Sequence, residues 1–286
     1  MPRAIDMHVH LPTASFLEGA IGPYRAAAER FFRTSVPVRE MDDVARYYED
    51  LDIIGVLLAW DAETATGLPP VTNQEVAEIV RRYPGRFIGF ASVDPWKGRR
   101  ALEEVERAIT ELGLKGVKFH PSLQAFYPHD ARFYPLYEKI AALGVPTIFH
   151  TGTSGLGAGL PGGGGIKLDY ARPIYLDTVA ADFPELIIIG AHTGWPWHEE
   201  LLAIIGHKPN VYMDLSGWSP RYMAATVLEA ARKRLSAKML FGSDYPFITP
   251  ERWLADFEAL DGFSEETRRQ ILYENAARIL NLTGSR

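Results

Sequence analysis

Two histidines with one residue between them, His8 and His10, end the first apolar segment of this 286-residue chain. Side chains alternate along a β-strand, so both imidazoles point the same way at the carboxyl end of the predicted strand. Imidazole nitrogens bind a divalent metal ion at about 2.0–2.1 Å, and this spacing lets both rings reach one ion. The pair predicts part of a metal site if further ligands reach the same place.

Three more polar residues stand at the carboxyl ends of later apolar segments: His150, His192 and Asp244. In a parallel barrel all strands end at one face, where the active site forms. Residues far apart in the sequence would then converge with His8 and His10. The pattern predicts a metal centre of imidazoles and a carboxylate at that face.

The elements that position these residues follow a repeating order of a short apolar run and an amphipathic segment. The runs are dense in Ile, Val, Leu and Phe, which is typical of strands buried on both faces of a parallel sheet. We expect strands at Ala4–His10, Ile53–Trp60, Phe87–Asp94, Gly116–Pro121, Pro146–Thr151, Leu186–Gly194, Val211–Ser216 and Lys238–Pro246. Helical spacing marks segments between them, among them Asn73–Tyr83, Arg99–Leu112, Phe133–Leu143, Ile174–Phe183 and Tyr222–Leu235.

Eight strands alternating with helices predict an α/β fold, a (β/α)8 TIM barrel, in one domain over residues 1–286. A doubly wound open sheet is the competing architecture, but such sheets usually have fewer strands. Two loop insertions, 11–38 and 152–170, interrupt the pattern, and the second contains a run of glycines. Loops that follow barrel strands emerge on the catalytic face, so both insertions would cover the site.

The composition of the chain limits its chemistry. It has no cysteine, which excludes disulfides, thiolate metal ligands, iron–sulfur clusters and a thiol nucleophile. A net charge of −6 and the lack of a long basic run argue against a nucleic-acid surface. No apolar run suits a signal peptide or a membrane span, so we expect a cytoplasmic protein with no membrane partner.

The order of these motifs resembles the amidohydrolase superfamily, which has HxH on the first strand, His on the fifth and sixth, and Asp on the eighth. Three short sequence segments resemble its amidohydrolase-2 branch, which includes aminocarboxymuconate semialdehyde decarboxylase. They are GVKFHP at 116–121, VPTIFHTG at 145–152 and FGSDYP at 241–246. The similarity runs over nearly the whole chain.

The resemblance implies a role for each of these residues. Four match the metal ligands of the branch: His8, His10, His150 and Asp244. His192 matches its catalytic histidine, and Asp244 can also move a proton, so both are predicted catalytic residues. One divalent metal ion is implied, with zinc the first expectation, although this ligand set also admits manganese, cobalt or iron.

Lys118 and His120 share one face of the predicted fourth strand. In superfamily members with two metals a carbamylated lysine bridges the ions; the resembling branch uses one metal, so we expect an unmodified Lys118. His120 lies nearer the barrel mouth and is a candidate contact for a substrate carboxylate. Asp214, on the seventh strand, is placed to orient a ligand histidine. Three more residues are candidates for substrate binding: Trp195, Trp218 and Arg221.

The intact ligand set favours an enzyme. A divalent metal lowers the pKa of a bound water toward about 7, which predicts a metal-dependent hydrolase acting on a small, anionic carboxylated, lactone or ester substrate. The alternative is a non-oxidative decarboxylase of aromatic acids or muconate semialdehydes, which would use the same residues. A non-catalytic binding protein of the same fold is a third hypothesis. Dimers are common in the resembling branch, which implies a homodimer.

Overall fold

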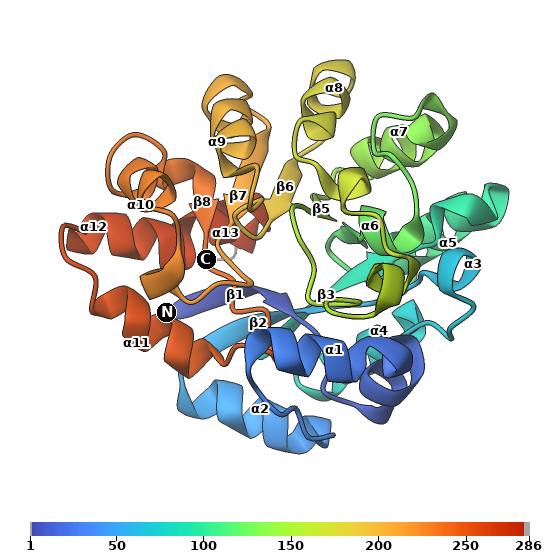
Figure 1. The fold of residues 1–286 in the computed structure, drawn as a ribbon, viewed down its shortest axis with the longest axis horizontal. Coiled ribbons are helices and arrows are strands. Elements are labelled where there is room, and N and C mark those ends of the chain that lie inside the picture. The colour runs from blue at the N-terminus through green and yellow to red at the C-terminus, as the bar shows by residue number, and fades with distance from the viewer. Residues whose placement is uncertain (1, 283–286) are drawn as a thin grey trace.

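Eight parallel strands in sequence order form the centre of the protein, and helices surround them (Figure 1). The computed structural model describes residues 2–282. The strands are β1 (Ala4–Val9), β2 (Ile53–Leu58), β3 (Phe87–Ser92), β4 (Val117–Phe119), β5 (Thr147–His150), β6 (Ile188–Ala191), β7 (Val211–Asp214) and β8 (Met239–Leu240). Each pairs in parallel with the next strand along the chain.

The two ends of this sheet meet. The backbone N–H of Met7 donates to the carbonyl of Phe241 at 2.9 Å. The backbone N–H of Asp244 donates to the carbonyl of His8 at 3.0 Å, so the segment after β8 pairs with β1. The predicted (β/α)8 TIM barrel is therefore confirmed.

The helices come mainly from the segments between the strands. Those described are α1 (Gly22–Phe32), α2 (Met41–Asp50), α3 (Glu63–Thr66), α4 (Asn73–Arg82), α5 (Arg99–Thr110), α6 (Pro121–Gln124), α7 (Tyr134–Ala142), α8 (Tyr175–Asp182), α9 (His198–His207), α10 (Ala225–Arg232), α11 (Pro250–Glu258), α12 (Glu265–Arg269) and α13 (Asn275–Ile279). Among them, no helix combines the length and the apolar composition that crossing a bilayer requires.

Apolar side chains pack on both sides of the strands. One buried cluster groups inward-facing side chains of the barrel with the C-terminal helix α13; its strand members include Ile5, Met7, Val56, Leu58, Phe90, Ile148, Ile189 and Leu240. A larger cluster joins the outward-facing side chains to the surrounding helices. Burial on both faces explains why the strand sequences read as continuous apolar runs.

A β-bulge in β1 decides which of its side chains face the barrel interior. Between Asp6 and Val9, β1 contains one residue more than the paired stretch of β2. The extra residue breaks the alternation of side chains. Asp6 therefore faces α2, where its carboxylate accepts a hydrogen bond from the hydroxyl of Tyr48 at 3.0 Å. His8 and His10 face the cavity at the barrel mouth.

The two predicted insertions lie against each other. Residues 11–38 contain a π-helical turn, η1 (Ser15–Ala20), and helix α1. The hydroxyl of Tyr24 donates to the carbonyl of Gly164 at 3.5 Å, which joins α1 to the glycine-rich segment. A Cβ on Gly155 would lie 2.8 Å from the ring of Phe32. Glycine there permits the close approach of the two insertions.

Candidate metal centre

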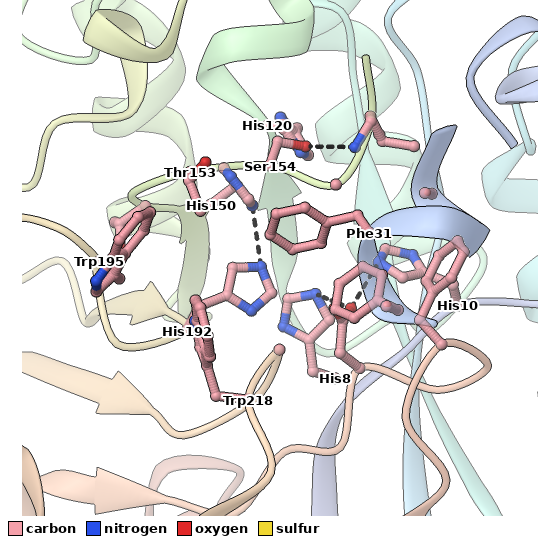
Figure 2. A pocket seen from close by; sticks show the side chains of 18 of the residues that line it. His8, His10, Phe31, His120, His150, Thr153, Ser154, His192, Trp195 and Trp218 are labelled. Atoms are coloured by element: carbon pink, nitrogen blue, oxygen red, sulfur yellow. Dashed lines mark hydrogen bonds and ion pairs between the residues drawn. The ribbon is translucent and has the colours of Figure 1, made fainter. Parts of the chain in front are cut away.

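Five histidines point into one cavity at the carboxyl ends of the strands, as Figure 2 shows. We call them the histidine cluster: His8, His10, His120, His150 and His192. All five are buried. Because the strands are parallel, their carboxyl ends meet at this face and bring together residues that are far apart in the sequence.

His192 directly follows β6 and Asp244 lies four residues after β8, so neither is inside a strand. Their φ angles are positive, 66° and 71°. This left-handed conformation is uncommon for residues other than glycine, and strained backbone of this kind concentrates at functional sites. The turns end the strands earlier than the apolar runs predict, and they direct both side chains toward the cavity.

Three groups approach closely enough to share one cation. Ligand atoms of His8, His192 and Asp244 all lie within 4.8 Å of one another. Asp244 Oδ1 lies 3.7 Å from His8 Nε2 and 3.5 Å from Nε2 of His10. A carboxylate among buried imidazoles is a donor set that fits one divalent metal ion.

His150 stands beside this group. Its Nδ1 is 2.9 Å from Nε2 of His192, and its Nε2 is buried without a hydrogen-bond partner. Nδ1 of His10 is also buried without a partner. An unpaired buried polar atom costs about 1–3 kcal/mol. A cation bound to Nε2 of His150 would remove one such cost. The site can therefore accommodate His150 as a metal ligand, and this role stays a prediction.

Asp214 orients two of the imidazoles. Its Oδ2 lies 3.0 Å from Nδ1 of His8, and its Oδ1 accepts a short hydrogen bond from the Ser216 hydroxyl. That hydroxyl lies 2.8 Å from Nδ1 of His192. A carboxylate only accepts, so Ser216 uses its proton on Asp214 and accepts from the Nδ1–H of His192. His8 and His192 therefore direct Nε2 toward the cavity, where these atoms lie beside Nζ of Lys118 and Nδ1 of His150, respectively.

The protonation states suit a cation. Burial lowers the pKa of His8 to about 3 and also lowers the pKa of the other imidazoles in the histidine cluster. Burial alone would raise the pKa of Asp214 and Asp244, but the adjacent histidines hold the pKa of both carboxyls below the usual value. At neutral pH the histidines are uncharged and the carboxylates ionised, as metal ligands must be.

Lys118 reaches the same cavity from β4. Its Nζ is 3.2 Å from Nε2 of His8, and burial lowers its pKa to about 8 despite the opposing charges of Asp214 and Asp244. Among the described residues that line the cavity, Lys118 is the single lysine or arginine. The cationic side chain of the cavity is thus Lys118, which is buried at the inner end.

Asp6 fixes the position of Asp244 from the other side of β1. Its carboxylate accepts from the backbone N–H of Ser243 at 2.8 Å and from the Ser243 hydroxyl at 2.5 Å. Burial raises the pKa of Asp6 to about 7, although these bonds oppose the rise. Asp6 is thus a positioning residue that the sequence analysis missed, because strict alternation would have put it inside the barrel.

The candidates for substrate binding divide into two groups. His120, Trp195 and Trp218 line the cavity, and the ring of His120 stacks on that of His150 at 3.8 Å. Arg221 lies outside: its side chain is 62% exposed and lies 3.9 Å from Asp256. Arg221 thus lies in a surface ion pair rather than in the cavity, and this placement gives no support to its predicted contact with an anionic substrate.

Other cavity residues were not among the predicted site residues. Trp60 lines the cavity and was within reach of prediction, because it ends the second predicted strand at the catalytic face. Phe16, Phe31 and Phe32 come from the insertion 11–38, and Phe247 follows Asp244. Their places depend on loop conformation, which residue types alone do not specify.

A family model described as amidohydrolase matches residues 5–282. The chain belongs to the amidohydrolase family. This agrees with the resemblance seen in the sequence, and the matched range includes every residue of the histidine cluster as well as Asp244.

Named relatives of this amidohydrolase are enzymes. The chain is 24% identical to 2-amino-3-carboxymuconate-6-semialdehyde decarboxylase from Dictyostelium discoideum, covering 98% of this chain and 84% of the relative. A TIM-barrel protein of uncharacterised function from Bordetella bronchiseptica superposes with a TM-score of 0.82 at 25% identity, covering 99% of each chain. A dihydroxybenzoic acid decarboxylase from Polaromonas sp. JS666, with bound manganese and 2-nitroresorcinol, superposes with a TM-score of 0.71 at 21% identity, covering 100% and 98%.

These likenesses change the order of the functional hypotheses. They agree with the predicted enzyme class, which covers hydrolases and carboxy-lyases. The hydrolase placed first in the sequence analysis finds no support among them, whereas the decarboxylase alternative does. The motif could not separate the two because both reactions use the same ligands and the same proton-carrying residues.

Proposed function

We propose that this amidohydrolase is a metal-dependent, non-oxidative decarboxylase of a small ring acid. The observation that carries the proposal is the joint placement of His8, His192 and Asp244 within 4.8 Å of one another, beside buried Lys118 and under an aromatic-walled cavity. The decarboxylases among its relatives support the reaction class.

The residues of the cavity would bind the metal ion and the substrate carboxylate at one end and carry a proton to the substrate. The metal ion, when bound, would polarise the substrate oxygens as a Lewis acid. His8, His10, His150 and Asp244 are the residues that would hold it. Lys118 would attract the substrate carboxylate to the same end of the cavity. Manganese and zinc are both compatible with these ligands.

The reaction breaks the bond between a ring carbon and the carboxylate carbon, which leaves as carbon dioxide. A proton takes its place on the ring carbon. His192 is suited to take up that proton from solvent at Nε2 and pass it to the ring carbon, because Ser216 holds its Nδ1 and directs Nε2 toward the cavity. The aromatic walls exclude bulk water, which strengthens electrostatic interactions in the cavity.

The experiment is carbon dioxide release from hydroxylated benzoic acids by manganese-loaded protein in heavy water. We expect carbon dioxide and a phenol with one deuterium at the former carboxyl position. His192→Asn should lower kcat by about 100-fold or more, and metal titration of the same variant measures whether His192 also contributes to metal binding. Turnover of lactones or esters without carbon dioxide release would instead restore the hydrolase hypothesis.

Two further expectations stay proposals for this chain. The homodimer implied by the resemblance is tested by sedimentation equilibrium of the full chain. The cytoplasmic location is tested by fractionation of the native cell.

A further inference from the structure

In the cavity, ionisable side chains lie at one end and mostly apolar side chains line the rest. The free space between its walls, including the part open to solvent, amounts to about 600 Å³. Its ionisable groups gather at the inner end: the histidine cluster, Lys118 and Asp244. Most of the remaining wall is aromatic or aliphatic: Phe16, Phe31, Phe32, Trp60, Leu156, Trp195, Trp218 and Phe247.

The aromatic wall is held by ring-to-ring packing. Phe16 stacks on His10 with centroids 4.9 Å apart and planes 7° apart. Phe32 stacks on Phe247 at 5.1 Å. The faces of aromatic rings carry partial negative charge. A carboxylate placed against this wall would lose its hydration and meet no cation, which is strongly unfavourable.

Two arginines of a neighbouring groove do not line this wall. Arg33 and Arg252 line a neighbouring groove that shares Phe31 and Trp218 with the cavity, and both are exposed to solvent. Neither is among the described residues that line the cavity itself. A compact substrate in the cavity would therefore find positive charge only at the inner end, from Lys118 and the proposed metal ion.

Uncharged polar groups are present along the wall. Thr151, Thr153 and Ser154 line one side. The indole N–H of Trp60 is buried without a hydrogen-bond partner, although Trp60 lines the cavity. A hydroxyl or carbonyl oxygen on the substrate would satisfy such a donor, and it would do so without bringing a second charge into the wall.

We propose that this site takes a compact ring acid with one carboxylate, bound at the inner end, and with uncharged polar substituents on the rest of the ring. It discriminates against compact dicarboxylates. This inference rests on the proposed function for the reaction, but it concerns the charge of the substrate and is tested separately by binding.

The test compares two ligands of the same shape that differ by one charge, 2-hydroxyisophthalate and its monoamide, 3-carbamoyl-2-hydroxybenzoate. Titration calorimetry of manganese-loaded protein gives Kd, and carbon dioxide release gives kcat/KM. We expect the monoamide to bind at least about 100-fold more tightly, because the second carboxylate of the diacid is left without a cation. Equal affinities, tighter binding of the diacid, or no binding of either ligand would overturn the proposal.

The two readouts separate this inference from the proposed function. If the monoamide binds selectively but releases no carbon dioxide, the substrate class stands and the decarboxylase assignment fails. If both ligands are decarboxylated equally well, the reaction stands and the charge selectivity fails. A gain-of-function variant adds an independent check: Phe31→Arg, at the cavity rim, should improve diacid binding by about 10-fold, whereas the matched Phe31→Leu should not.

Discussion

At the scale of single residues, Asp214 holds two imidazoles that belong to different strands. One of its oxygens binds His8 directly, and the other reaches His192 through Ser216. An amide at this position would donate as well as accept, so it could not serve both contacts. We expect Asp214→Asn to weaken manganese binding and to lower kcat, each by about 10–100-fold. Metal titration and carbon dioxide release measure the two effects.

Ser216 offers a sharper variant, because it contacts His192 and not His8. Ser216→Ala should lower kcat by about 10-fold while Kd for manganese stays within a factor of about two. The pH profile of kcat should shift as well, since the His192 tautomer is no longer fixed. An equal loss of metal affinity in Ser216→Ala and Asp214→Asn would contradict the proposed division between the two residues.

The sequence indicated that the site residues lie close together, but it did not indicate which of them contact one another. His8, His150 and Asp244 could be placed together because each ends an apolar run, and parallel strands end at one face. The orienting role of Asp214 followed from its place on the seventh strand. The contact between His150 and His192 depends on side-chain torsions, and the outward turn of Asp6 depends on a bulge. Neither feature has a signature in residue type.

At the scale of elements, helix α1 and the glycine-rich segment form one wall of the cavity. A Cβ on Gly155 would lie 2.8 Å from the ring of Phe32 and 3.1 Å from that of Phe31. Gly155→Val should therefore displace these rings and raise KM by about 10-fold, with a smaller effect on the metal site. Gly22→Ala is the matched control, because a Cβ there meets nothing within 4 Å. An unchanged KM in Gly155→Val would show that the rings of Phe31 and Phe32 can shift without affecting substrate binding.

The order of strands and helices was predictable because dense apolar runs mark the strands and helical spacing marks the segments between them. Five amphipathic segments were singled out, and helices α4, α5, α7, α8 and α10 lie within or overlap them. Strand ends were less predictable. The predicted strands continued past Ala191 and Leu240 to the turns in which His192 and Asp244 have positive φ, so the prediction overstated the length of β6 and β8. The insertions follow no such period: residues 11–38 were expected to cover the site, but helix α1 within them was not predicted.

At the scale of the whole molecule, metal binding should stabilise the fold, because the ligands come from β1, β5 and the segment after β8. A ligand at 100 times its Kd adds about 2.7 kcal/mol to the free energy of unfolding. For a chain of this size that corresponds to a rise in Tm of roughly 4–5 °C. Differential scanning calorimetry of chelated and manganese-loaded protein measures it. Asp244→Asn should lose most of the rise; a full rise in that variant would contradict the assigned ligand.

Stability without metal should depend steeply on pH, because the histidine cluster is buried in its uncharged form. Each of these imidazoles has a lowered pKa in the folded protein and titrates near 6.5 when unfolded. Below about pH 6.5 the unfolded chain binds more protons, so stability present above that pH is lost on acidification, by about 1.4 kcal/mol per pH unit for each histidine. Urea unfolding of chelated protein between pH 7.5 and 5 measures the free energy of unfolding. This free energy should show a plateau and then fall as the pH decreases, with a slope that corresponds to several protons taken up on unfolding. His120→Asn should reduce that slope by one proton; a wild-type slope of one proton or less would mean that the cluster is solvated.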